Sequence, residues 1–219
     1  MNYLIWQLAD SAFPAGGFAH SGGLEAAMHH GWLRDASSVH AFARHTVLQT
    51  ARASLPLASA AHRDPAALEE LDSFSEVLLT NPVANRASCA QGRALLNTTA
   101  RVFPEAPIAD IERRVSGHPL AGHYAPLFGV ITGALQISLE DAQRLFLFLA
   151  SRGIGNAAVR LGLMGAFEAQ SLQASLGPDI ELAIQRFGTL DAMESAQPAP
   201  AIDLFQSTHD RLYSRLFQS

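Results

Sequence analysis

The sequence predicts an all-α protein, a bundle of roughly eight to ten helices built as one domain over residues 1–219. Three observations carry this prediction. Apolar residues recur at helical spacing along most of the chain, and helix-start signals precede several of these stretches. Sustained alternation of apolar and polar residues, which strands require, is missing. With 48% hydrophobic and 16% charged residues, the composition is that of a globular protein.

The first long helix is predicted over residues 39–55. Apolar side chains advance there by fours along one face: Val39, Ala43, Val47, Ala51 and Leu55. Pro56 should kink or end this helix, because proline lacks the amide hydrogen that an interior position donates.

Start signals place the next helices. Asp64-Pro65 and Asn81-Pro82 each pair an N-cap residue with a proline at the first helical position. Ser138, with Asp141 three positions later, starts another helix. The helix after Asp64 carries an apolar stripe, formed by Leu68, Leu71, Phe74 and Leu78.

Four glycines lie in the apolar helical pattern of residues 146–170, at positions 153, 155, 162 and 165. A glycine inside a helix costs about 1 kcal/mol relative to alanine, so close packing of helices or subunits is the expected compensation. Arg152 and Arg160 in the same stretch should bind carboxylates or backbone carbonyls, or lie at an interface.

The one compositional break is SAQPAPAID, residues 195–203, and an amphipathic tail follows over residues 201–219. Helical spacing puts Phe205, His209, Leu212 and Leu216 on one face, with Arg211 and Arg215 one turn apart. A tail of this kind either packs on its own core or docks on a partner.

The loop ADSAFPAGGFAHSGGLE, residues 9–25, resembles a phosphate cradle at first sight. A nucleotide site is excluded because no strand precedes the glycines and no lysine follows them. Pro14 and Gly16-Gly17 instead predict a chain reversal that leads into a short helix stopped by Gly31. Phe13 and Phe18 are then either core anchors or exposed contact residues.

No catalytic residue and no cofactor-binding residue is predicted. All 15 cationic residues are arginine, so lysine chemistry is excluded. Cys89 is the single cysteine, and its simplest interpretation is a small apolar residue. The nine histidines lack chelating spacing, so no metal site is predicted; His20 is kept as a candidate ligand, with a turn-capping role favoured.

Two properties of the sequence indicate which partners and which cellular location to expect. A formal charge of −5 argues against nucleic acid as a partner. The N-terminus has no signal-peptide pattern, and the apolar run at residues 145–150 is too short to cross a bilayer. We therefore expect a cytoplasmic protein.

Five blocks of the chain resemble the UreF-type urease accessory proteins, in the order that this family shows. They are LADSAFPAGGFAHSGGLEAA, RASCAQGRALL, GHYAPLFGVITGALQ, NAAVRLGLMGAFEAQ and HDRLYSRLFQS. The first and last blocks are the most specific, and together the blocks extend over nearly the whole chain.

The resemblance implies an all-α homodimer with no catalytic activity and no cofactor of its own. Such proteins join a UreD/UreH-type accessory protein and a UreG-type GTPase, whose activity they are thought to modulate, and the assembly inserts nickel into apo-urease. Nickel and GTP would thus act through the partner proteins.

The same resemblance nominates contact residues at both ends of the chain. In the terminal block these are Asp210, Arg211, Tyr213, Arg215, Leu216 and Phe217. In the N-terminal block they are Phe13, Pro14, Gly16, Gly17 and Phe18. Two other functions stay open: a helical enzyme with a metal or cofactor held by His118, His123 or His20, and an adaptor unrelated to urease.

Overall fold

The computed structural model describes residues 3–104 and 107–219, and the all-α prediction is confirmed. These residues form twelve α-helices, four short 3₁₀ helices and no strand. The number is above the predicted range because helices such as α1 and α2 have six residues each, about half the usual length. The α-helices are α1 (Leu4–Ala9), α2 (Leu24–His29), α3 (Ala36–Ala53), α4 (Leu55–Arg63), α5 (Leu68–Leu78), α6 (Pro82–Val102), α7 (Ile108–Gly117), α8 (Tyr124–Ala134), α9 (Leu139–Arg160), α10 (Ala166–Ser175), α11 (Gly177–Phe187) and α12 (Pro200–Thr208).

The predicted helix starts are confirmed, and each has a side chain that accepts hydrogen bonds from free backbone amides. Asn81 accepts from Val83 and Ala84 at the start of α6. Ser138 accepts from Asp141 at the start of α9. Asp64 caps a short 3₁₀ helix, Pro65–Ala67, that leads into α5. Helix α3 ends at Ala53, before Pro56 as predicted, and Pro56 lies in the first turn of α4.

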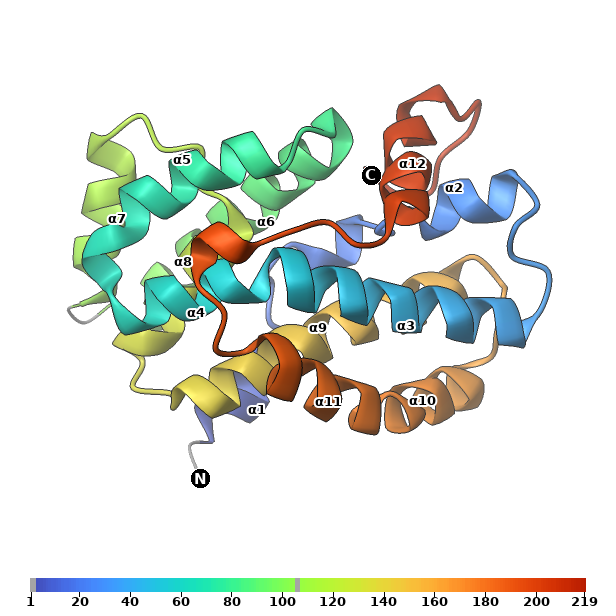
Figure 1. The fold of residues 1–219 in the computed structure, drawn as a ribbon, viewed down its shortest axis with the longest axis horizontal. Helices are drawn as coiled ribbons and strands as arrows, with labels where there is room; N and C mark the ends of the chain where they lie inside the picture. Colours follow the sequence, from blue (N-terminus) through green and yellow to red (C-terminus); the bar gives the residue numbers. More distant parts are fainter. Residues whose placement is uncertain (1–2, 105–106) are drawn as a thin grey trace.

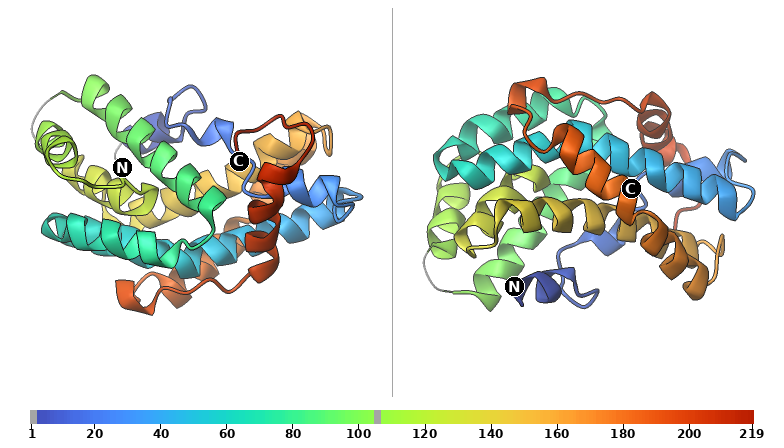
Figure 2. Two further views of the ribbon diagram at one scale, coloured as in Figure 1. Left: turned by 90° about the horizontal axis from the view of Figure 1, so that it is seen from above. Right: turned by 60° about the horizontal axis from the view of Figure 1, so that its bottom comes forward.

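The helices form two apolar clusters that share two long helices. In Figure 1, α3 and α4 run across the middle, α5 to α8 lie at one end, and α2 and α12 lie at the other. The larger cluster takes Val47 from α3 and Phe146 from α9, and the smaller one takes Val39 and Ile154 from the same two helices. Helices α10 and α11 lie along α3 and α9 (Figure 2). The shared helices make one continuous structure.

Two glycines allow helices to approach backbone closely. A Cβ at Gly129 of α8 would lie 2.2 Å from the carbonyl oxygen of Ala58 in α4. A Cβ at Gly92 of α6 would lie 2.2 Å from the carbonyl oxygen of Gly122, in the loop before α8. Any larger residue at either position would force the backbone apart.

The prediction of four glycines inside one helix is wrong for two of them. Helix α9 ends at Arg160, so Gly162 lies in the following turn with a positive φ, and Gly165 is the N-cap of α10. Of the two that are helical, Gly155 faces Ala169 of α10, whereas Gly153 has open space around its Cα.

The predicted helical face of the tail is also wrong beyond His209. Helix α12 and the 3₁₀ helix His209–Arg211 end before Leu212, and residues 212–219 are not helical. Arg211 and Arg215 are therefore not one helical turn apart. The helical spacing does not continue into structure because Glu25, far away in the sequence, accepts hydrogen bonds from the amides of residues 216 and 217.

No helix in the described part of the chain has the length and apolar character needed to cross a membrane.

Candidate functional site

The two ends of the chain that the sequence singled out lie against each other. We call residues 10–23 the N-terminal loop and residues 212–219 the C-terminal hook. The amide of Ser21 donates to the main-chain oxygen of Ser219 at 2.6 Å, and the amide of Gln218 donates to the carbonyl of Ala19 at 2.8 Å. The hook thus satisfies its backbone polar groups on the N-terminal loop rather than in a helix.

Glu25 of α2 holds the hook from the inside. Its carboxylate is 2% exposed and accepts the amides of Leu216 at 2.6 Å and Phe217 at 3.2 Å. The Nε2 atom of His209, also buried, lies 2.9 Å from the same carboxylate. A buried carboxylate needs this many donors to offset its lost hydration.

Arg160 of α9 joins the loop to the hook. Its guanidinium carbon lies 4.0 Å from the ring centre of Phe18 and 4.1 Å from that of Phe217, so the cation is held between two aromatic faces. It also donates to the carbonyl of Phe18. Arg152 donates to the carbonyl of Ala9. Of the alternatives predicted for these two arginines, the structure shows binding to backbone carbonyls.

The predicted contact residues of the N-terminal loop separate into inner and outer groups. Phe13 is half-buried against the larger cluster, and the carbonyl of Pro14 accepts from Thr98 of α6. Gly16 has a φ of 78° and faces Ala94, so a side chain there would be strained. Gly17 starts the 3₁₀ helix Gly17–Ala19, and Phe18 is 68% exposed. The loop also covers a cavity of about 760 Å³ that α3, α6 and α9 complete.

His20 points its ring at the hook. Its Nδ1 atom lies 2.5 Å from the hydroxyl of Ser219. Burial, followed by the proximity of His209, lowers the pKa of His20 below its ordinary value. The side chain therefore joins the two segments, while the backbone amide of His20 caps the 3₁₀ turn Gly17–Ala19 by donating to the carbonyl of Gly17.

The outer face of the hook is exposed. Tyr213 is fully exposed, Leu216 is 52% exposed, and Arg211 has no side-chain partner among the described residues. Asp210 binds Arg86 of α6 at 2.6 Å and Arg215 at 3.3 Å. The hydrogen bond from Arg86 lowers the pKa of Asp210. Phe217 alone of the predicted hook contacts is buried.

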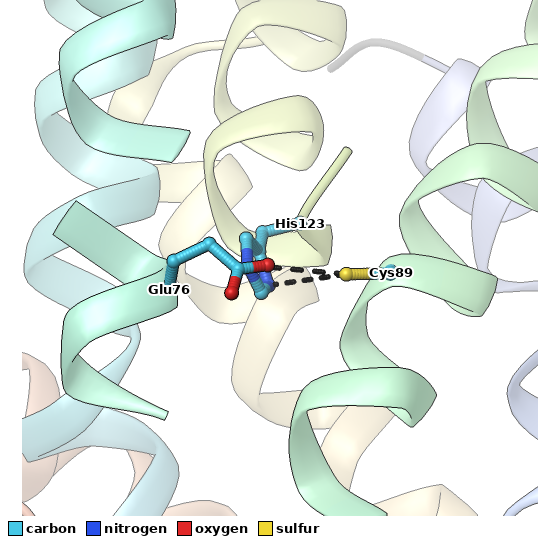
Figure 3. A group of neighbouring side chains, drawn as sticks. All are labelled: Glu76, Cys89 and His123. Carbon is cyan, nitrogen blue, oxygen red and sulfur yellow. Dashed lines mark hydrogen bonds and ion pairs between the residues drawn. The ribbon is translucent and has the colours of Figure 1, made fainter. Parts of the chain in front are cut away.

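A second constellation lies between α5, α6 and the start of α8. Glu76, Cys89 and His123 point toward one another (Figure 3), and their potential ligand atoms all lie within 4.8 Å. Nε2 of His123 is 3.0 Å from Glu76 Oε1 and 3.9 Å from Cys89 Sγ. His123 is fully buried, whereas Glu76 reaches solvent. Burial, with Glu76 and Asp72 next, raises the pKa of the Cys89 thiol.

Polar contacts fix the position of His123. The carboxylate of Asp72 accepts the amides of Ala121, Gly122 and His123. The hydroxyl of Ser88 lies 3.1 Å from Nδ1 of His123 and accepts the amide of Tyr124. The sequence analysis missed this cluster, because its members are 13 and 34 positions apart on separate elements. The sequence feature nearest to the cluster is the block RASCAQG, in which Cys89 lies one turn before the close-packed Gly92.

The three histidines of the enzyme hypothesis do not converge. His20 faces Ser219, His118 lies 3.9 Å from Glu69, and His123 faces Glu76. Each is occupied by a different partner on a different element.

Comparisons with known proteins point to one family. The sequence model of the UreF family matches residues 33–177. Urease accessory protein F of Oryza sativa subsp. japonica is 37% identical over 216 residues, which cover 97% of this chain and 83% of that protein. The protein of the same name in Arabidopsis thaliana is 35% identical over 223 residues, covering 100% and 93%. Urease accessory protein UreF of Arthrobacter sp. (strain FB24) is 30% identical over 215 residues, covering 98% and 96%.

Proposed function

The chain belongs to the UreF family of urease accessory proteins, and we propose that it serves urease maturation as a non-catalytic scaffold for nickel insertion into apo-urease. In this proposal it acts in the cytoplasm as a homodimer. It joins a UreD/UreH-type accessory protein to a UreG-type GTPase and modulates that GTPase, while nickel and GTP are handled by the partners.

One observation supports a contact role for the hook. Glu25 holds its backbone and Arg160 packs on the ring of Phe217, while Tyr213 and Leu216 of the hook, and Arg211 just before it, are exposed. Tyrosine and arginine are enriched among the residues that anchor protein interfaces. Because the backbone is already ordered, binding through this face loses less conformational entropy than binding through a disordered tail.

The test is co-purification with the neighbouring accessory proteins. Arg211→Ala combined with Arg215→Ala, and separately Tyr213→Ala, should each weaken capture by at least about tenfold, as expected for interface anchors. Both variants should keep the wild-type melting temperature and oligomeric state. Arg101→Ala combined with Arg113→Ala is the matched control, since these exposed arginines lie on α6 and α7 at the other end of the molecule. Unchanged capture by the hook variants would refute the contact role.

Urease activation tests the broader proposal. A purified activation system without this chain should leave apo-urease largely inactive at low nickel, and adding the wild-type chain should restore activity. Full activation without the chain would favour the unrelated adaptor. Turnover of a small substrate by the purified chain would favour the enzyme.

Deleting the whole tail is a poor substitute for these point variants. Truncation after Pro200 would remove the buried Phe205 and His209 together with the hook. Loss of partner capture by such a variant would therefore mix loss of contact with loss of stability.

A further inference from the structure

The Glu76–Cys89–His123 cluster offers three kinds of ligand atom in one place. A carboxylate oxygen, a sulfur and an imidazole nitrogen converge from α5, α6 and the residue before α8. Ligands around a tetrahedral ion, at 2.0–2.3 Å from it, lie about 3.3–3.8 Å from one another. The distances from His123 Nε2 to Glu76 Oε1 and Cys89 Sγ are 3.0 and 3.9 Å, and all three candidate ligand atoms lie within 4.8 Å of one another, so side-chain movements would bring them around one ion.

The surroundings of His123 suit a metal ligand. A ligating histidine normally donates its second ring N–H to a fixed acceptor, which sets the tautomer. Ser88 Oγ lies 3.1 Å from Nδ1 and has two lone pairs, so it can accept from Nδ1–H as well as from the amide of Tyr124. Nε2 is then the free ring nitrogen; it lies 3.0 Å from Glu76 Oε1, and Cys89 Sγ lies 3.9 Å from Nε2 and 3.7 Å from Nδ1. The loop itself is held by Asp72, so the imidazole is positioned before any ion arrives.

From this juxtaposition we infer that Glu76, Cys89 and His123 form a binding site for one divalent transition-metal ion of the Ni²⁺ or Zn²⁺ class. Sulfur and imidazole ligands favour these ions over Mg²⁺ and Ca²⁺, which prefer oxygen alone. Three protein ligands leave a fourth position for water or an exchanging ligand, on the side where Glu76 reaches solvent. The inference goes beyond the proposed function, in which nickel is bound by the partners.

Binding has a defined proton balance. His123 ligates through a neutral imidazole nitrogen, Glu76 through its carboxylate and Cys89 through its thiolate, so the thiol proton passes to solvent when the ion binds.

Cobalt titration of the purified, reduced full-length chain tests the site without any partner or urease. Co²⁺ should bind one per chain, produce a near-ultraviolet thiolate-to-metal charge-transfer band, and be displaced by Ni²⁺ or Zn²⁺. Bound metal should also slow alkylation of Cys89. Loss of the band in Cys89→Ala, with the fold intact by circular dichroism, would support the site.

A second variant keeps the test decisive even where substitution of the buried His123 prevents folding. Glu76→Gln changes an exposed side chain and should weaken Co²⁺ binding by at least about tenfold while retaining the charge-transfer band. Glu69→Gln is the matched control. Glu69 is on the same helix as Glu76 but lies beside the exposed His118, so this substitution should leave Co²⁺ binding unchanged. The inference is wrong if the wild type shows no band, if the band persists in Cys89→Ala, or if the two glutamate variants behave alike.

Discussion

The hook and the loop before α8 are both held by a buried carboxylate, but the two segments are bounded differently. Glu25 accepts two amides of residues that follow the last helical turn, and Asp72 accepts three amides of a loop with α7 on one side and α8 on the other. Glu25 also contacts the buried His209, whereas Asp72, among the described residues, accepts only amides of its loop. Because separate carboxylates hold the hook and the loop carrying His123, we expect each segment to loosen without the other.

The largest expected effect is that of Glu25→Ala. It removes the acceptor of two amides and leaves His209 buried without its partner. Leaving a buried donor without its acceptor costs about 1–3 kcal/mol for each group. We expect a lower melting temperature and fast hydrogen exchange of the Leu216 and Phe217 amides, measured by mass spectrometry. Exchange in residues 121–123 should stay slow if the two segments are held independently.

Two further variants check the cause. Glu112→Ala removes an exposed glutamate from α7 and should change stability by less than about 0.5 kcal/mol. Glu25→Gln keeps the shape of the side chain and one acceptor oxygen. Its loss of stability should therefore lie between that of Glu25→Ala and that of Glu112→Ala. Equal losses for Gln and Ala would mean that the carboxylate charge, rather than the hydrogen-bond acceptors, fixes the hook.

Gly92→Ala should have the next largest effect, and in the other segment. Its new Cβ would contact the carbonyl of Gly122 at 2.2 Å, and backbone cannot move aside as a flexible side chain can. Overpacking of this kind costs about 1–3 kcal/mol. Residues 121–123 should then exchange faster, while the hook stays protected.

Gly153→Ala is the matched control for Gly92→Ala. Gly153 is also helical, but its Cα faces open space. The substitution should stabilise α9 by about 0.5–1 kcal/mol, because alanine is the better helix former. Destabilisation by both variants would show that chain stiffness, and not the close approach of α6 to the loop, explains the effect at Gly92.

The local part of the fold could be predicted from the sequence, because its causes lie within a few residues. Asn81 and Ser138 cap helices whose free amides are two or three positions away. The path of the hook could not be predicted in this way. Helical spacing continues through Leu216, but Glu25 offers those amides better partners from almost the whole length of the chain away.

The candidate sites show the same difference between features with local causes and features that depend on distant residues. Tyr213 and Arg211 were nominated by a family block, and both are exposed, Tyr213 in the hook and Arg211 directly before it. Cys89 was interpreted as a small apolar residue because no chelating spacing surrounds it. Its neighbours His123 and Glu76 come from other elements, so only the packing of α6 against the loop reveals the cluster.

The smallest expected effect is a pH dependence of the hook that runs through His20. Its pKa is lowered from 6.5 by burial and then by His209, so between the lowered value and 6.5 the unfolded chain binds more protons. The stabilisation is therefore complete above about pH 6.5 and is lost as the pH falls through the lowered pKa. We expect the protection factors of the Ser21 and Gln218 amides, which correct for the slower intrinsic exchange in acid, to fall on acidification through this range. His20→Gln should reduce that dependence, whereas His118→Gln, at a half-exposed position, should retain it. If His20→Gln leaves the pH dependence intact, the prediction is wrong and the protonation of His20 does not control the hook.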